Sequence, residues 1–419
     1  MDKLELPPRV NALALLCCLA GANALLQGQA VETLSLPQAL EQAVTHNPLL
    51  EAAASKTVGA EGLRTQAGLK PNLRLTVTSE NLRAWEFSTP FRVAHGTDSW
   101  IYGTQTVERG AKRQSRIALA TAGVERTQAE QELFTAQLRA RVATAYWTAS
   151  AAVRVSELYR QDLAAFEQIV DYNRQRVKEG AAAGADLLRV EIERDRLAAT
   201  GKRVDQEAEA ALINLLKEMG RSDYPTLRLT DALDTLPTPE MLPPDQVLNS
   251  RPELHVAQTL QHQQERNADL QKANALADPE YSFGYKRTIG LDGLYLSLTI
   301  PIPVRNRNQG SIAAAEADIV TARHLLRASR LQILAELETA QRDYKARKAA
   351  LETTLVPLRA RAHEAERIAL GAYREGGVDL LRFLDAERTS IETDVLYYRS
   401  LSELQLSVVN LKLAQGQHL

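Results

Sequence analysis

Charged side chains flank two glycine-rich segments of the chain, and these residues have the types and spacing that could do chemistry. The segments run from Glu179 to Asp186 and from Glu375 to Asp379, and each is followed by a helical pattern that begins with two leucines. An aspartate in this position caps a helix by accepting a hydrogen bond from a backbone N–H group of the first turn. We therefore expect both aspartates to be helix caps. The candidate functional residues are Glu179, Gly180, Gly184, Asp186, Arg189, Glu375, Gly376, Gly377, Asp379, Arg382 and Asp385.

Patterns typical of enzymes are missing from the sequence, which has no phosphate loop, no dinucleotide fingerprint and no His-Glu-x-x-His zinc helix. His255 and His262 are seven residues apart and share a helix face, but they lack a clustered third ligand, so exposed polar histidines are favoured over a metal site. We expect no catalytic residue, no cofactor, no metal ligand and no enzymatic activity. The net charge of -2 argues against nucleic acid as a partner.

The N-terminal residues 1–30 have the pattern of a secretory signal peptide, because positive charges precede a short apolar stretch. Small residues favour cleavage after Ala24 or Ala30. A retained membrane anchor is the alternative, although the apolar core is shorter than the ~20 residues of a spanning helix. Cys17 and Cys18 both lie in this segment, so the mature chain would have no thiol. Lipid modification of a cysteine stays open, but large leucines precede the pair.

An internal repeat organises the rest of the chain, because residues recur at a constant offset of 196 positions. The glycine and asparagine pairs are the most informative, and they are Gly180 with Gly376, Asn214 with Asn410, and Gly220 with Gly416. We assign residues 31–240 to the first copy and 241–419 to the second. Each copy has the pattern of a helix, a β-hairpin, a very long helix, a glycine-rich break and a further helix.

The long helix of the first copy is expected from about residue 115 to 179, which corresponds to about 95 Å. Apolar residues recur there every seven positions, a spacing typical of helices that pack along their length. They include Val142, Ala149 and Val170 in the first copy, and Leu337, Tyr344 and Leu351 in the second. Pro357 should kink or break the second long helix.

Three segments alternate between apolar and polar residues, as a strand with one apolar face does, and a fourth, the partner strand Trp100–Val107, alternates less clearly. They lie near residues 73–78, 100–107, 281–286 and 294–302. Small hairpins packed on the helices and membrane-spanning strands both fit this pattern. No apolar run after the N-terminal segment is long enough for a transmembrane helix, so a membrane protein of this sequence would have to be a β-barrel. Four strands cannot close a barrel, and several protomers would have to pool them.

The junctions between the strands and the long helices resemble a known family. Thr106–Arg113 followed by Ile117–Ala120 resembles the strand-to-helix junction of TolC-like outer membrane efflux proteins. Ile300–Pro303 with Asn306–Gly310 is similar to the second junction in the heavy-metal branch of that family, the cobalt-zinc-cadmium type. The resemblance covers nearly the whole chain after the signal segment.

This resemblance implies a mainly α-helical fold with a transmembrane β-barrel portion, in which a homotrimer forms a 12-stranded barrel and an α-helical tunnel. Such a protein is a passive duct in the bacterial outer membrane, with its helical part in the periplasm. Its partners would be outer membrane lipid, a periplasmic adaptor (membrane fusion) protein and an inner-membrane pump of RND type. Metal cations would be the cargo, and the glycine-rich segments would form the periplasmic aperture and the adaptor docking site.

At the aperture, three copies of Asp186 or of Asp379 would form a ring that selects against anions. The repeat pairs Asp186 with Arg382 and Arg189 with Asp385, which inverts the charges between the copies. This inversion suits a network of ion pairs that holds a closed mouth. The alternatives are a periplasmic coiled-coil adaptor or scaffold without a channel, and a duct for drugs or secreted proteins.

Overall fold

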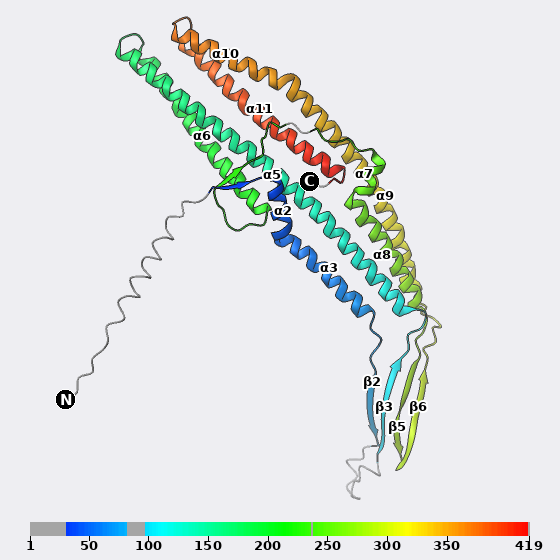
Figure 1. Cartoon of the computed structure of the whole chain (residues 1–419). Coiled ribbons are helices and arrows are strands. Elements are labelled where there is room, and N and C mark those ends of the chain that lie inside the picture. Colours follow the sequence, from blue (N-terminus) through cyan, green and yellow to red (C-terminus); the bar gives the residue numbers. More distant parts are fainter. Residues whose placement is uncertain (1–30, 82–96, 236–237, 418–419) are drawn as a thin grey trace, which may run out of the picture.

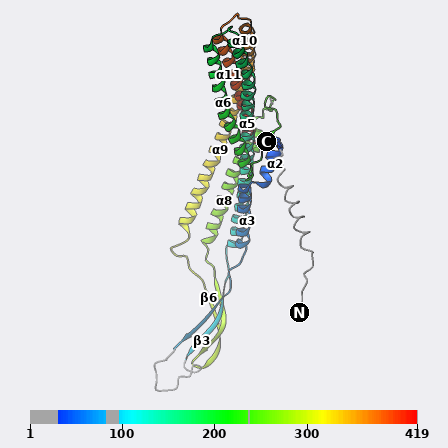
Figure 2. The same ribbon diagram turned by 90° about the vertical axis from the view of Figure 1, so that its left-hand side faces the viewer.

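The computed structural model describes residues 31–81, 97–235 and 238–417, and the predicted signal peptide lies outside these residues. The molecule is elongated, with helices at one end and a four-stranded sheet at the other (Figures 1 and 2). Among the described residues, no helix combines the length and the apolar character needed to cross a membrane.

The helices occur in the same order twice, each time with a pair of strands inserted before the longest helix. The helices of the first half are α2 (Leu36–His46), α3 (Pro48–Ala67), α5 (Lys112–Lys178) and α6 (Gly184–Glu218). Those of the second half are α7 (Pro244–Ser250), α8 (Pro252–Asn274), α9 (Gln309–Ala350), α10 (Val356–Arg374) and α11 (Leu380–Ala414). The long helix expected from residue 115 to 179 therefore exists as α5, within three residues of its predicted start. The domain boundaries at residues 31, 240 and 419 stay a prediction.

The two glycine-rich segments connect antiparallel helices, so that α5 with α6 and α10 with α11 form two hairpins whose tips lie at the same end of the molecule (Figure 1). The seven-residue stripes lie in the interfaces between helices. Val142, Ala149 and Val170 are fully buried, and Leu337 and Leu351 are buried in the second stripe. Burial of these side chains explains why rods this long stay together, because each apolar side chain removed from water contributes about 1.5–3 kcal/mol.

The second long helix is interrupted near Pro357, as we expected from the sequence. It consists of α9, a π-helical turn over Leu351–Leu355, and α10 with Pro357 in its first turn. Proline has no N–H group to donate to the preceding turn, and a π-helical turn is a usual local adjustment in an interrupted helix. The equivalent residue of the first copy, Gln161, lies inside the continuous α5.

The four-stranded sheet is antiparallel in the order β2-β3-β5-β6. Its strands are β2 (Arg74–Glu80), β3 (Asp98–Thr106), β5 (Glu280–Thr288) and β6 (Leu291–Thr299). The predicted alternation is confirmed. One face carries apolar side chains that are largely exposed in the protomer, including Leu75 (72%), Phe283 (63%) and Leu296 (73%). The sheet extends away from the helices, so the alternative of small hairpins packed on them is wrong (Figure 1).

A second, two-stranded sheet was not predicted. β1 (Glu32–Leu34) pairs in parallel with β4 (Leu227–Leu229) beside the middle of α5. The hydroxyl of Tyr146, whose side chain is fully buried, donates to the Leu34 carbonyl (3.1 Å) and to the Asp231 carboxylate (2.5 Å). This small sheet is thereby fastened to the helices at the centre of the molecule.

Candidate functional site

Both hairpin tips use the same backbone geometry to end the incoming helix. Gly180 (φ +72°) and Gly376 (φ +79°) adopt the left-handed conformation that favours glycine. The next residue at each tip donates a backbone hydrogen bond back into the helix, from Ala181 to Arg176 (2.8 Å) and from Gly377 to Ala372 (2.7 Å). These bonds satisfy carbonyl groups that the last helical turn leaves free. The glycines are therefore structural terminators, and the candidate residues around them lie on the tips.

The two tip aspartates differ in what they do. Asp379 caps α11, because its side chain accepts a hydrogen bond from the backbone N–H of Arg382 (3.0 Å), as predicted. The prediction that Asp186 caps α6 is wrong. The cap position of α6 is Ala183, which offers no side-chain acceptor, and Asp186 lies inside the first turn. A carboxylate at that position stabilises the helix only through its attraction to the partial positive charge of the helix N-terminus.

This asymmetry predicts opposite effects of two substitutions at equivalent positions. Asp379→Ala should weaken the first turn of α11 by about 1 kcal/mol, because a cap is lost, and Ala183→Asp should strengthen the first turn of α6 by a similar amount. Amide hydrogen exchange in these turns measures both effects, with a change of about fivefold expected in each direction. Equal exchange in Ala183→Asp and the parent protein would contradict the capping argument.

The charges predicted to form a closed-mouth network do not meet within one chain. Over the described residues, Asp186, Arg189 and Arg382 form no side-chain ion pair, and Asp385 pairs only with Arg388 (3.5 Å) on its own helix. Glu179 and Glu375 are exposed beside the terminating glycines. A network between Asp186 and Arg382 therefore requires contacts between protomers.

An aromatic cluster, which the sequence did not predict, joins the two tips within a protomer. We call it the tip cluster, and its buried members are Phe166, Ile169, Val170, Val190, Tyr373, Leu380 and Phe383. Phe383 is fully buried and stacks on Tyr373, with ring centroids 5.4 Å apart. The Tyr373 hydroxyl donates to the Asn173 side chain of the other hairpin, and the Tyr172 hydroxyl donates to the Arg374 carbonyl (3.3 Å). Aromatic residues form only 5% of the chain. Their concentration near the tips was therefore the sequence feature from which this cluster could have been predicted.

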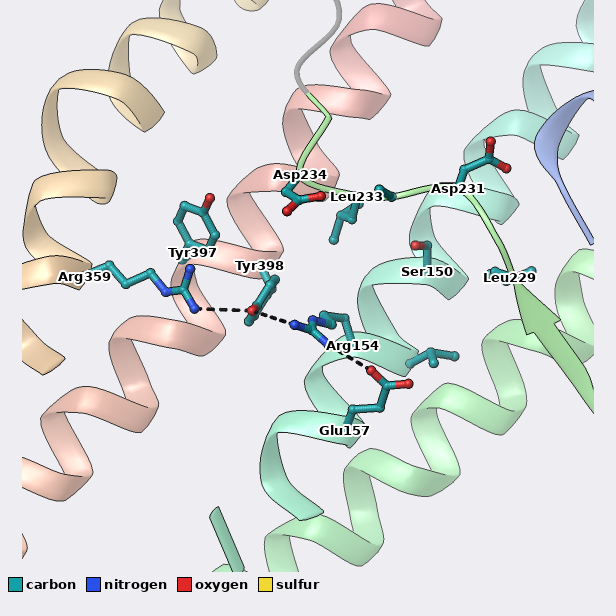
Figure 3. A pocket seen from close by; sticks show the side chains of 12 residues that line it. Ser150, Arg154, Glu157, Leu229, Asp231, Leu233, Asp234, Arg359, Tyr397 and Tyr398 are labelled. Atoms are coloured by element: carbon teal, nitrogen blue, oxygen red, sulfur yellow. Dashed lines mark hydrogen bonds and ion pairs between the residues drawn. The ribbon is translucent and has the colours of Figure 1, made fainter. Parts of the chain in front are cut away.

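A second polar site lies where α5, α10 and α11 meet the loop after β4 (Figure 3). Its cavity has a volume of about 270 Å³. The Tyr398 hydroxyl accepts hydrogen bonds from Arg154 and Arg359 (both 3.3 Å), and these arginines also pair with Glu157 (3.1 Å) and Asp394 (2.6 Å). Each guanidinium is thus already matched by a carboxylate. The arrangement holds the hairpins together and presents no activated nucleophile or base.

The two histidines on one helix face take part in interhelical contacts. His255 lies 3.4 Å from Glu132 and His262 lies 3.0 Å from Glu125, so both contact α5 from α8. Their side chains are 51% and 40% exposed. Across the part of the chain that the structure describes, no group of three or more His, Cys, Asp or Glu side chains is arranged to hold a metal ion.

Comparison with known proteins identifies relatives although no family model matches the chain. The cobalt-zinc-cadmium resistance protein CzcC of Cupriavidus metallidurans is 24% identical over 380 residues, which are 90% of this chain and 88% of that protein. The nickel-cobalt-cadmium resistance protein NccC of Alcaligenes xylosoxydans xylosoxydans is also 24% identical, over 73% of this chain and 69% of that protein. The solved structure of the outer-membrane channel OprN superposes with a TM-score of 0.73 at 20% identity, covering 91% of this chain and 90% of OprN.

The similarity to CzcC extends over nearly all of both chains, and the likeness to OprN includes the helices and the sheet together. The strand-to-helix junctions that first suggested the family lie where β3 leads into α5 and β6 into α9. Sequence and fold together show that the chain resembles the TolC-like outer membrane efflux proteins, with sequence relatives named for heavy-metal resistance and the fold of the channel OprN.

Proposed function

We propose that the protein is the passive outer membrane duct of a tripartite efflux system that exports metal cations. A homotrimer forms the duct, an inner-membrane pump of RND type supplies the cargo, and a periplasmic adaptor docks at the hairpin tips. The observation that carries the proposal is the exposed apolar face of the four-stranded sheet at one end of a row of long helices (Figure 1). The duct itself performs no reaction, and its export is powered by the pump.

The sheet has the dimensions and surface of a membrane-embedded segment. β3, β5 and β6 are nine residues long, close to the ~9–11 residues of a tilted membrane-spanning strand. Apolar side chains cover one face, whereas the other face carries residues such as Thr76, Thr104 and Ser282. An apolar face toward lipid and a polar face toward water is the expected arrangement of such strands.

The edges of the sheet favour assembly of several copies. β2 and β6 are the edge strands, and within the described part of the protomer each leaves a row of backbone groups without a partner. Backbone groups in a bilayer require a partner, because no water is present to replace it. Pairing of β6 of one copy with β2 of the next satisfies both edges, and three copies of the four strands give twelve strands.

The helices next to the sheet follow the same order as the strands. Contacts run from α3 to α5, from α5 to α8 and from α8 to α9, in parallel with the strand order. α3 has no buried residue, and its Val58 and Leu63 are 67% and 68% exposed, while Leu331 of α9 is 64% exposed. These apolar side chains lie on the two outer helices of the row. In a trimer α9 of one copy packs against α3 of the next and closes a helical tunnel that continues from the strands.

Metal cations are favoured as cargo by the relatives, since both are named for resistance to divalent metals. Drugs and secreted proteins are the competing cargoes. The residues of this chain do not decide between these cargoes, because the duct is passive and the choice among cargoes belongs to the pump. Deleting the coding region from its host should lower tolerance to cobalt, zinc or cadmium, and plasmid-borne protein should restore it. Unchanged metal tolerance with lowered drug tolerance would favour the competing cargo.

Location and assembly are tested independently of cargo. The protein should fractionate with outer membranes and run as a trimer that dissociates on heating. The main competing function, a periplasmic coiled-coil adaptor or scaffold, predicts release with the soluble periplasmic fraction. Recovery there, without a heat-modifiable trimer, would refute the duct.

The tip charges provide a further prediction for the assembled duct. If Asp186 and Arg382 of neighbouring protomers pair in a closed mouth, Asp186→Ala and Arg382→Ala should each raise the open probability in lipid bilayers. Exposed ion pairs contribute about 0.2–1 kcal/mol, so an increase of up to about fivefold is expected. Arg342→Ala is the matched control, because Arg342 is 79% exposed on α9 and pairs only with Glu338. Unchanged conductance and voltage response in both tip variants would exclude the network.

A further inference from the structure

A group of carboxyl side chains lies between the two hairpins and has no role in the proposed transport. We call it the carboxyl cluster, formed by Asp162 of α5, Glu366 of α10 and Glu387 of α11. Glu387 is only 7% exposed, and Glu366 lies close enough to raise the pKa of its carboxyl group. The Oδ2 atom of Asp162 is buried and has no hydrogen-bond partner. Three acidic groups from three helices thus share one interface, in which Glu387 is buried and Asp162 and Glu366 are half-buried.

Few positively charged side chains lie near the carboxyl cluster to balance its negative charge. His363 of α10 lies 3.7 Å from Glu366 and 3.0 Å from Asp394, and its side chain is 45% exposed. Arg359 pairs with Asp394 (2.6 Å), so its charge is already matched. Among the described residues, neither Asp162 nor Glu387 forms a salt bridge with an arginine or a lysine, whereas the nearby Asp394 does. The carboxyl cluster therefore has more acidic groups than the surrounding cations neutralise.

A buried carboxyl group beside a second carboxyl group is ionised only at a large electrostatic cost, and the two groups relieve this cost by sharing a proton. A proton held by Glu387 removes this cost at the carboxyl cluster. Burial is the main cause that raises the pKa of Glu387, and the neighbouring Glu366 and Asp162 raise it further. Burial also raises the pKa of Asp162 to about 6, with Asp394 and Glu366 adding to the effect.

We propose that the carboxyl cluster is a proton-binding site that holds the α10–α11 hairpin against α5. With a proton between Glu366 and Glu387, the interface with Asp162 carries little net charge and the helices pack together. Loss of the proton places carboxylates of α11 and α5 face to face, and their repulsion favours separation of the hairpins. The π-helical turn over Leu351–Leu355 precedes α10 and is the point in the second long helix where the hairpin can move.

The direction of the pH effect follows from proton linkage. The packed state binds protons more tightly than the separated state, in which the carboxyls titrate near their ordinary values of 3.8 and 4.5. The packed state is therefore most stable below those values, and it loses stability as the pH rises through the raised pKa values. Acid should close the hairpins, and mildly alkaline conditions should loosen them.

The proton is tested directly by infrared spectroscopy of the full-length protein in detergent. At pH 6.5 the protein should show the absorption of a protonated carboxyl group, and Glu387→Gln should lose it. Glu392→Gln is the matched control, because Glu392 lies on the same helix with a 72% exposed side chain. Glu366→Gln provides a second variant should Glu387→Gln fail to fold, as judged by circular dichroism. Absence of the absorption in the parent protein, or its persistence in both cluster variants, would overturn the proposal.

A second measurement uses conductance in lipid bilayers and rests on the proposed duct function. The open probability of the parent protein should fall as the pH is lowered from 8 to 5, whereas Glu387→Gln should stay at its low-pH value throughout. Glu392→Gln should follow the parent. The same pH response in both variants would contradict the proposal. A protein that gives no conductance at any pH would instead refute the duct, and the infrared result would still decide whether the carboxyl cluster binds a proton.

Discussion

Replacing Phe383 with alanine should open the hairpin tips. Phe383 is fully buried in the tip cluster, where its ring stacks on Tyr373 at 5.4 Å between centroids. Truncating a buried phenylalanine costs about 3–5 kcal/mol, through lost apolar contacts and the cavity that remains. The tip cluster joins the two hairpins, so most of this cost falls on the packed arrangement. A change of 3 kcal/mol shifts an equilibrium on the order of a hundredfold.

The expected result is a large rise in open probability at low voltage, measured for single trimers in lipid bilayers. Leu381→Ala is the control, because Leu381 lies two residues away on the same helix and is 58% exposed. It removes a similar apolar group but leaves the tip cluster intact. If both variants conduct as the parent does, the tip cluster has no part in closing the duct.

Local patterns in the sequence predicted most of the helical end of the molecule. Three kinds of signal were local: the seven-residue apolar spacing, the helix-terminating Gly180 and Gly376, and Pro357. Each of them determines the backbone of only the neighbouring residues, so its effect does not depend on the rest of the fold. The family resemblance then placed these elements in a known architecture. Its prediction of the fold is confirmed by the solved channel OprN, and the relatives named for metal resistance support the predicted efflux function.

Contacts between distant segments could not be read from local patterns. The strands β1 and β4 have three residues each, too few for a recognisable alternation, and they pair across about half the chain. The tip cluster joins Asn173 to Tyr373, and the repeat partner of Tyr373 is Val177, so comparing the copies did not reveal it. Long-range pairing of this kind depends on how complete helices are placed.

The wrong prediction about Asp186 has a simple origin. Both helices begin at equivalent positions, Gly184 and Leu380, so the equivalent of the capping Asp379 is Ala183. The glycine-rich segment of the first copy placed an aspartate nearby, but three residues further along the chain. Its role at the aperture stays a prediction, as do those of the other charged tip residues.

Gly284→Ala should prevent correct assembly of the sheet. A Cβ atom at this position of β5 would lie 2.2 Å from the Ile101 carbonyl oxygen and 2.4 Å from the Tyr102 Cα atom. Both are backbone atoms of β3, so no side-chain movement can relieve the contact. Across β5 the Tyr102 and Tyr295 rings approach to 4.7 Å between centroids, in register with this glycine. Overpacking costs about 1–3 kcal/mol or more, and here it separates two paired strands.

Gly293 of β6 is the matched control, because it is a glycine of the adjacent strand at a position on the same face of the sheet as Gly284. A Cβ atom there would meet only the Lys286 carbonyl oxygen at 3.8 Å, an ordinary contact. The measurement is the yield of heat-modifiable trimer in outer membranes. Gly284→Ala should reduce it by roughly tenfold or more, as 1.4 kcal/mol or more of destabilisation implies, while Gly293→Ala leaves it unchanged. Equal yields would mean that β3 and β5 can separate at this point without loss of the assembly, and that the close approach at Gly284 does not constrain the sheet.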